Sequence, residues 1–223
     1  MPVSQTARPR VGRKRPGVVP SLTCEEILAT GLRLADELGI ERVSMRRLAT
    51  ELGKAPMALY TYFDSIQQIH EGIVALAFRE VDTAAIPGER WDDTLRRTTA
   101  SIRQMYLNHS HVDLFKVEGA AYSPTLAEHT DRVYRLHTEQ GIPADILRKA
   151  WRIIDAFLGG FILAELHELN RSVEHPDHDG RPWIETAEGA YSQEAFSDGI
   201  EIIIAGIRSL AAPDPCDWHT PLD

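Results

Sequence analysis

The sequence predicts an all-α protein, with an N-terminal three-helix domain of the helix-turn-helix type and a C-terminal helical domain. Apolar residues recur at steps of three and four along most of the chain, as in helices that bury one face. Residues 40–63 hold two short patterns of this kind, one on each side of Gly53. With 223 residues and 43% hydrophobic content, the chain can build the core of one or two domains.

The first expected helix begins at Thr23. Thr23 and Glu26 have the spacing of a capping box, in which each residue satisfies a backbone donor at the start of the helix. One apolar stripe follows, formed by Ile27, Leu28, Gly31, Leu34, Ala35 and Leu38. This helix would be the platform for the next two.

Residues 40–63 read "IERVSMRRLATELGKAPMALYTYF" and predict two helices joined by a tight turn. Ser44 is a suitable N-cap, and Gly53 can take the left-handed conformation that ends a helix. Pro56 suits the first turn of the second helix, where its missing N–H is not needed. Leu59 and Phe63 would face inward, and the outward positions are Met57, Ala58, Thr61 and Tyr62. Two helices joined this way form a helix-turn-helix unit, whose second helix enters the major groove of DNA.

Asp64 or Ser65 can cap a further helix that carries Ile66, Ile69, Ile73, Val74, Leu76, Ala77 and Val81. We therefore expect a helix-turn-helix DNA-binding domain over residues 21–82. A module of this size has a small core and would be stabilised by the domain that follows.

Positive charge is concentrated near the N-terminus. The chain has a net charge of −9, yet residues 1–20 contain no acid and the basic residues Arg8, Arg10, Arg13, Lys14 and Arg15. Residues 21–66 add five basic and seven acidic side chains, which leaves the acidic excess beyond residue 66. The stretch "RPRVGRKRPG" mixes Arg with Pro and Gly, so we expect residues 1–20 to be a flexible basic arm. Such an arm can lie along phosphates or reach into a minor groove; the alternative is a solubilising tail.

The run from Ile27 to Leu76, with "VSMRRLATELGKAPMALYTYF" inside it, resembles the DNA-binding domain of the tetracycline-repressor family of bacterial regulators. The resemblance implies an all-helical homodimer with one helix-turn-helix unit per subunit and a divergent helical ligand-binding domain. It also implies that a small-molecule effector releases the protein from double-stranded operator DNA.

The resemblance places DNA contacts on Ser44, Arg46, Lys54, Ala55, Pro56, Met57, Ala58, Tyr60, Thr61 and Tyr62, and the arm would add Arg13, Lys14 and Arg15. Arg46 and the two tyrosines can donate to phosphates, whereas the small and apolar side chains suit contact with thymine methyl groups. We expect Tyr62 to face DNA and Tyr60 to lie partly in the core. Ile66 stands where the family commonly has Lys, so one phosphate contact is expected to be missing.

Beyond the linker "DTAAIPGER", the pattern predicts a helical effector-binding and dimerisation domain over residues 91–212, followed by a tail over 213–223. Helices are expected over 91–108 and from Ser123 or Pro124 to about Gln140. Two more are expected over 146–169 and 193–210, with a short piece around 112–118. The resemblance implies that the last two long helices pair with their copies in a homodimer, where we place Gly159, Gly160, Ile200 and Ile204. For the ligand pocket, we single out Tyr106, Trp151 and Asp155 because they combine aromatic surface with orienting polar groups.

Other classes of protein fit less well. No catalytic motif is present, and His175, Asp177, His178 and Asp179 match no closed metal pattern, so we expect no catalytic residue, metal or cofactor. A metal-dependent enzyme using this His/Asp loop is one alternative, and a helical protein-interaction module that has lost DNA binding is another. No signal peptide or membrane-spanning run is seen, and there are only two cysteines, which favours a cytoplasmic protein.

Overall fold

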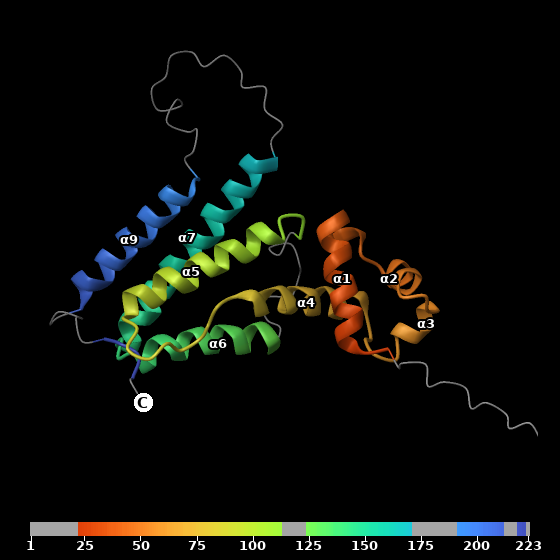
Figure 1. Cartoon of the computed structure of the whole chain (residues 1–223), viewed down its shortest axis with the longest axis horizontal. Coiled ribbons are helices and arrows are strands. Elements are labelled where there is room, and N and C mark those ends of the chain that lie inside the picture. The colour runs from red at the N-terminus through yellow and green to blue at the C-terminus, as the bar shows by residue number, and fades with distance from the viewer. Residues whose placement is uncertain (1–21, 113–123, 171–190, 212–217, 222–223) are drawn as a thin grey trace, which may run out of the picture.

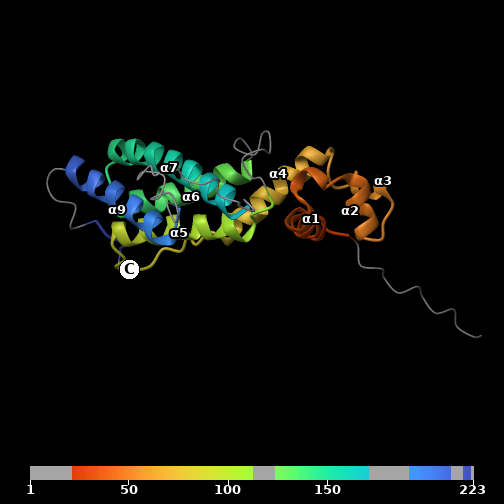
Figure 2. The same ribbon diagram turned by 90° about the horizontal axis from the view of Figure 1, so that it is seen from above.

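A computed structural model describes residues 22–112, 124–170, 191–211 and 218–221 (Figure 1). The regular secondary structure of these residues is helical, apart from an isolated antiparallel bridge between Arg90 and His219. The molecule is elongated. The small N-terminal helices lie at one end and the long C-terminal helices at the other, as the second view also shows (Figure 2). No helix in the described ranges is long and apolar enough to cross a membrane.

The N-terminal domain consists of α1 (Cys24–Leu38), η1 (Ile40–Arg42), α2 (Met45–Glu51), α3 (Pro56–Leu59) and α4 (Ile66–Ala77). The capping box predicted at Thr23 and Glu26 is present, with the Glu26 amide donating to Thr23 Oγ1 over 3.1 Å. The core of this domain contains the fully buried side chains of Ile27, Leu48 and Leu59, which come from three different helices. Burial of these side chains is the main force that holds such short helices together.

Helix α4 is the backbone connection between the two ends of the molecule (Figure 1). Ser65, not Asp64, is its N-cap, and its hydroxyl accepts from the Gln68 amide. Its packing against α1 is close. A Cβ built on Gly31 would lie 2.7 Å from Ile73 Cδ1, so a larger residue at position 31 would require the Ile73 side chain to shift. A short 3₁₀ turn, η2 (Phe78–Glu80), follows α4 and leads into the linker.

The C-terminal domain is formed by α5 (Trp91–Asn108), α6 (Pro124–Glu139), α7 (Ala144–Asn170) and α9 (Gln193–Leu210). The predictions for α5 and α9 are confirmed at both ends, and those for α6 and α7 to within a few residues. Helices α5, α7 and α9 pack side by side around Phe196, Ile154 and Ile162. The short piece expected around 112–118 and the loop between α7 and α9 fall mainly outside the described residues.

A buried ion pair joins these three helices. Arg103 on α5 donates through Nε to Glu165 Oε2 on α7 over 2.8 Å, and both side chains are buried. The same guanidinium also contacts Gln193 at the start of α9, and it lies over the ring of Phe196. A buried charge without a partner is costly, so this pair fixes the relative position of the helices more than it adds net stability.

The linker between the domains is held in place rather than loose. Arg97 on α5 donates to the carbonyl oxygen of Ala84 over 2.8 Å and to Glu89 Oε1 over 2.9 Å. The hydrogen bond from Arg97 to the Glu89 carboxylate lowers the pKa of Glu89. Residues 218–221 of the expected tail lie against the same linker: the Thr220 amide donates to the Glu89 carbonyl oxygen over 2.8 Å. The linker is thus fixed from both sides.

Candidate nucleic-acid interface

The turn between α2 and α3 has the geometry of a Schellman motif. Gly53 has φ of 62°, the left-handed conformation predicted for it. The Lys54 amide donates to the Ala49 carbonyl oxygen over 2.8 Å, and the Gly53 amide donates to the Thr50 carbonyl oxygen over 3.1 Å. These two bonds satisfy carbonyl groups at the end of α2 and reverse the chain at once. The direction of α3 relative to α2 is therefore fixed by backbone hydrogen bonds.

The start of α2 is fixed just as firmly. Ser44 is its N-cap, as predicted, and Ser44 Oγ accepts from the Arg47 amide over 3.3 Å. His70 on α4 bonds through Nε2 to the carbonyl oxygen of Val43 over 3.0 Å, which ties the entry of α2 to α4. On the other side, Arg33 on α1 binds both Glu37 and Glu51, so α1 and α2 are joined by an ion pair. The hydrogen bonds that Arg33 donates to these two carboxylates raise its pKa.

Helix α3 presents an outer face that the protein's own core does not cover. Leu59 is fully buried and anchors the helix, whereas Met57 has 75% of its surface exposed and Tyr60 47%. Ala55, Pro56 and Thr61 are also exposed, and Ala58 is half-buried. A methionine this exposed gains nothing from folding, so its surface is available for contact with another molecule.

The structure corrects the expected roles of the two tyrosines. Tyr60, expected partly in the core, is the more exposed of the two, whereas Tyr62, expected to face outward, is half-buried and packs against the core. The reason is that α3 is shorter than the pattern suggested. It ends at Leu59, and turns at Tyr60–Tyr62 redirect the side chains that follow.

Cationic side chains lie in and just before α2 and in the turn that leads to α3. Arg42, Arg46 and Arg47 are exposed and Lys54 is half-buried, and within the described residues none of the four forms an ion pair with a carboxylate. Arg33, by contrast, is occupied by its two glutamates. Sequence reasoning selected Arg46 and Lys54 but not Arg42 and Arg47. The sequence did contain a local signal for these two arginines. Both lie within three residues of the N-cap Ser44, and they are therefore close to the N-terminus of α2.

The residues expected to line a ligand pocket lie on α5 and α7. Tyr106 is half-buried with its ring edge-on to Phe78, at a centroid distance of 6.0 Å. Burial, with a smaller contribution from the negative charge of Asp155, raises the pKa of Tyr106. Asp155 is exposed, and Trp151 is half-buried one turn earlier on α7. Tyr106 and Asp155 are therefore close enough to interact, with Trp151 beside Asp155 on the same helix.

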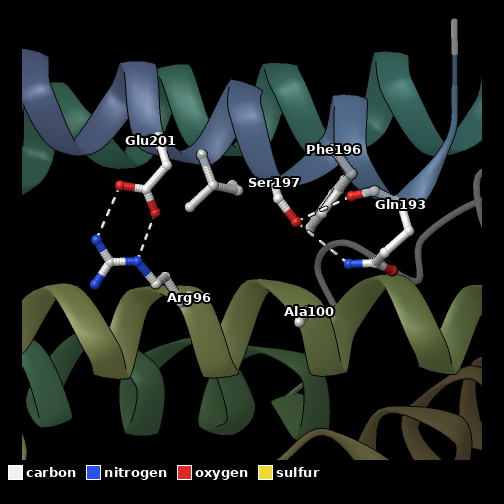
Figure 3. A pocket seen from close by; sticks show the side chains of 7 residues that line it. Arg96, Ala100, Gln193, Phe196, Ser197 and Glu201 are labelled. Carbon is white, nitrogen blue, oxygen red and sulfur yellow. Dashed lines mark hydrogen bonds and ion pairs between the residues drawn. The ribbon is translucent and has the colours of Figure 1, made fainter.

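A hollow lies between α5 and α9 and is lined by Arg96, Ala100, Gln193, Phe196, Ser197, Ile200 and Glu201 (Figure 3). Arg96 closes one end by donating to both carboxylate oxygens of Glu201, over 2.5 and 2.9 Å. The hollow has a volume of about 140 Å³, less than half of the roughly 300 Å³ at which small-molecule sites begin. We therefore do not assign an effector to it.

The residues expected at a dimer interface divide into two groups. Ile200 and Ile204 have 2% and 0% of their surface exposed, so they belong to the core of their own subunit and cannot meet a second copy. This corrects the expectation for these two side chains: the apolar stripe on α9 faces α5 and α7. Gly160 is exposed with no atom within 4 Å of a Cβ built on it, and Gly159 is half-buried. The large apolar side chains exposed on the two helices are Ile153, Leu163 and Leu169 on α7 and Ile202 and Leu210 on α9.

Two groups of expected residues lie outside the described ranges. They are Arg13, Lys14 and Arg15 in the basic arm, and the histidines and aspartates of the loop between α7 and α9. Among the residues that the structure describes, no group of three or more His, Cys, Asp or Glu side chains could hold a metal ion.

A helix-turn-helix unit whose second helix is exposed and whose first helix carries exposed arginines, followed by a larger helical domain, defines a class: the DNA-binding transcriptional regulators. Comparison with known proteins gives the family. Residues 27–73 match the family described as bacterial regulatory proteins, tetR family, and residues 85–191 match the tetracyclin repressor-like C-terminal domain. The chain belongs to the tetR family of transcriptional regulators, which confirms the resemblance seen in the sequence.

Two relatives are similar along most of their length. The HTH-type transcriptional repressor DrrR1 of Streptomyces coeruleorubidus is 23% identical, over 88% of this chain and 84% of the relative. An HTH-type transcriptional regulator of Saccharopolyspora erythraea is 24% identical, over 86% of this chain and 87% of the relative.

Solved structures have the same fold. ActR of Streptomyces coelicolor in complex with actinorhodin superposes with a TM-score of 0.70 and 22% identity, covering 88% of this chain and 99% of ActR. BioQ with its natural double-stranded DNA operator gives a TM-score of 0.59 and 20% identity, covering 84% of this chain and 99% of BioQ. The all-α prediction, with an N-terminal helix-turn-helix and a C-terminal helical domain, is confirmed.

Proposed function

We propose that this regulator is a homodimeric transcriptional repressor, which binds a palindromic operator through α2 and α3 and is released when a small molecule binds the C-terminal domain. The observation that carries the proposal is the outer face of α3, where Met57 and Tyr60 are exposed, together with the exposed arginines of α2. Exposed apolar side chains combined with Arg and Lys are a combination that can bind double-stranded DNA. The cations meet phosphates, and the apolar atoms meet thymine methyl groups.

DNA contacts are assigned by position on this face. Ser44, Arg46 and Lys54 would bind phosphates together with Arg42 and Arg47, and Tyr60 would add its hydroxyl. The exposed residues Ala55, Pro56, Met57 and Thr61 and the half-buried Ala58 would approach base edges. The basic arm would contribute Arg13, Lys14 and Arg15. None of the side chains placed at the base edges can form a bidentate bond to a base, so we propose that the shape of the operator contributes to its recognition.

Dimerisation would use the exposed side of α7 and α9. Ile153, Leu163, Ile202 and Leu210 are large apolar side chains on these helices that the subunit's own core leaves exposed. Gly160 and Gly206 are exposed on the same two helices with no atom within 4 Å of an added Cβ, which permits close helix approach. Two-fold pairing through these helices would present two helix-turn-helix units to half-sites about 34 Å apart or slightly more.

Effector binding would occur between α5 and α7, near Tyr106, Trp151 and Asp155. Aromatic surface combined with a phenol and a carboxylate can hold a largely apolar ligand and orient it by a few polar contacts. The solved relatives named above include one bound to actinorhodin and one bound to operator DNA, which supports a two-ligand function for this chain. Release would follow if the effector favours a dimer whose α3 helices are wrongly spaced.

The proposal is tested by selecting fragments from sheared genomic DNA with the purified full chain and then sequencing them. We expect enrichment of a few fragments that share an inverted repeat. Footprinting should show protection of both halves of the repeat, and light scattering should show two copies of the chain on each fragment. Absence of enrichment over a matched sample of the Met57→Glu, Arg46→Ala double variant would contradict DNA recognition by α3. Enrichment without an inverted repeat would contradict the two-fold arrangement.

A further inference from the structure

His109 lies where three helices from both domains meet. It is the C-cap residue of α5, and its backbone N–H donates to the carbonyl oxygen of Met105 over 3.1 Å. Its Nδ1 lies 2.8 Å from Oδ1 of Asp36 in the last turn of α1, and its Nε2 lies 3.1 Å from Oε1 of Glu80 in η2. One side chain of the effector domain therefore contacts the DNA-binding domain and the junction between the two.

The two contacts together require a protonated ring. A neutral imidazole carries one N–H and one acceptor nitrogen, and a carboxylate oxygen only accepts. Neutral His109 could therefore donate to one of its carboxylates, while its other nitrogen would face the second carboxylate as acceptor against acceptor. Only the imidazolium donates to both. His109 is buried, whereas Asp36 and Glu80 are partly exposed, so the ring has a fixed place and the carboxylates reach solvent.

The surroundings also favour the cation. The C-terminal end of α5 carries the negative end of a helix dipole. Asp36 lies near the C-terminal end of α1, whose last turn contains no basic residue. Glu80 is held by a second hydrogen bond, from the Asn108 amide to its Oε2 over 3.3 Å. Among the described residues, these two carboxylates are the charged groups that face the ring; Arg79 and His111 nearby in sequence are exposed. Although burial opposes it, the hydrogen bonds that the His109 ring donates to Asp36 and Glu80 raise the pKa of His109.

The contact between His109 and α1 is linked to the DNA-binding helices through a second ion pair. Asp36 is on the same helix as Arg33, which binds Glu51 at the end of α2. The His109–Glu80 contact, in contrast, stays at the end of α4. A rotation of the DNA-binding domain about the end of α4 would therefore break the bond to Asp36 and leave the bond to Glu80 in place.

We propose that His109 is a proton-operated clasp that locks the DNA-binding domain to the effector domain, and that it is a positioning residue for α2 and α3. With the ring protonated, the two domains move as one body, and effector-driven shifts of α5 are transmitted to α1. With the ring neutral, one bond is lost and the domains are less tightly coupled. A raised pKa means that the clasp is complete below the unfolded-state value of about 6.5 and is lost as pH rises through the folded-state value.

The first test needs no DNA. Proton NMR titration of the histidine Cε1–H signals of the full chain, assigned with His109→Gln, should give a pKa above about 6.5 for His109, the ordinary histidine value. Asp36→Asn and Glu80→Gln should each lower it, while His111→Gln, the neighbouring exposed histidine, should leave it unchanged. A His109 pKa at or below the ordinary value, or one that neither carboxylate variant moves, would overturn the proposal.

The second test measures coupling between the domains. Hydrogen exchange at the end of α1, where the Gly39 amide is bonded to Ala35, is followed at about pH 6 and about pH 9 and corrected for intrinsic rates. Protection should be higher at the lower pH in the wild type and in His111→Gln, and independent of pH in His109→Gln. If His109→Gln folds poorly, Asp36→Asn can replace it in this experiment, because Asp36 is partly exposed and its substitution should disturb the fold less. Equal pH dependence in the wild type and both clasp variants would overturn the coupling.

A third readout rests on the proposed function. When the pH is raised from about 6 to about 9, the operator affinity of the wild type should fall by a factor about five times larger than that of His109→Gln. The reason is that the complete clasp at the lower pH holds the DNA-binding domain in the orientation needed for binding. Identical ratios would overturn the role of the clasp in DNA binding. If neither protein bound DNA at any pH, the proposed function would fail, whereas the titration and exchange results would still decide whether the clasp exists.

Discussion

The amide of Lys54 donates to the carbonyl oxygen of Ala49 over 2.8 Å, and this single bond spans the whole turn of the helix-turn-helix unit. It can form because Gly53, between them, has φ of 62°. The residue that bonds to the end of α2 is thus a neighbour of the residues that begin α3. The orientation of the DNA-facing helix depends on a backbone conformation that glycine adopts at low cost.

Gly53→Ala should reduce stability and DNA binding together. A side chain in the left-handed conformation costs about 1–2 kcal/mol, and relief of this strain would turn α3 away from its present direction. Gly141→Ala is a matched control, since Gly141 has φ of 96° but lies between α6 and α7, far from the interface. Chemical denaturation and anisotropy with operator DNA should show a loss of stability in both variants, but a loss of affinity only in Gly53→Ala. Unchanged affinity in Gly53→Ala would mean that the turn does not position α3.

Tyr60 and Tyr62 should respond differently to truncation. Tyr60→Ala is expected to weaken operator binding with little change in stability, because the side chain is exposed. Tyr62→Ala should also destabilise the fold, by about 1–3 kcal/mol, because the ring packs against the core. Tyr62→Phe retains that packing and isolates the contribution of the hydroxyl to DNA binding. A Tyr62→Ala variant that melts like the wild type would show that the ring is not part of the core.

Gly160→Leu should weaken the dimer without damage to the subunit. Beyond the adjoining backbone of α7, no atom of the described residues lies within 4 Å of a Cβ at this position, and leucine favours helix over glycine by roughly 0.5–1 kcal/mol. Sedimentation or light scattering over a concentration series should detect monomer, while circular dichroism should report full helicity. Ala127→Leu, at an exposed position on α6, is the control and should remain dimeric. A dimer of undiminished strength in Gly160→Leu would exclude this face of α7 from the interface.

Buried His137 should make the protein sensitive to mild acid. Burial lowers the pKa of His137 to about 4. Because the folded-state pKa lies below the unfolded value of about 6.5, this group favours the fold at neutral pH and loses its contribution as pH falls from about 6.5 towards 4. The loss should reach roughly 3 kcal/mol, and His137→Leu should abolish that part of the pH dependence. The clasp at His109 acts in the opposite direction, so denaturation should be compared in the His109→Gln background. Identical pH profiles with and without His137 would contradict the buried neutral ring.

Local chemistry made much of the fold predictable from the sequence. The caps at Thr23 and Ser44, the stop at Gly53 and the start at Pro56 depend on neighbours within a few residues, and the structure confirms all four. The helices α5 and α9 were likewise marked by apolar repeats with clear ends. Signals of this range survive in a single sequence because no distant residue is needed to create them.

Other features depended on distant partners. An apolar repeat shows that Ile200 and Ile204 share a face of α9, but not whether that face meets its own subunit or a second copy. Tyr62 was misplaced because α3 ends after one turn, which periodicity alone does not reveal. His109 lies 73 residues from Asp36 and 29 from Glu80, so nothing in its sequence neighbourhood predicts the clasp.

The central claim is that α3 enters the major groove of operator DNA with Met57 at its exposed centre. The most direct measurement is the affinity of the selected fragment for the wild type and for Met57→Glu, by fluorescence anisotropy at one salt concentration. A carboxylate on this face would be repelled by the phosphates and would lose the apolar contact with base edges. We therefore expect an affinity loss of about a hundredfold or more with an unchanged melting temperature. Equal affinity of the two proteins would contradict DNA recognition by α3.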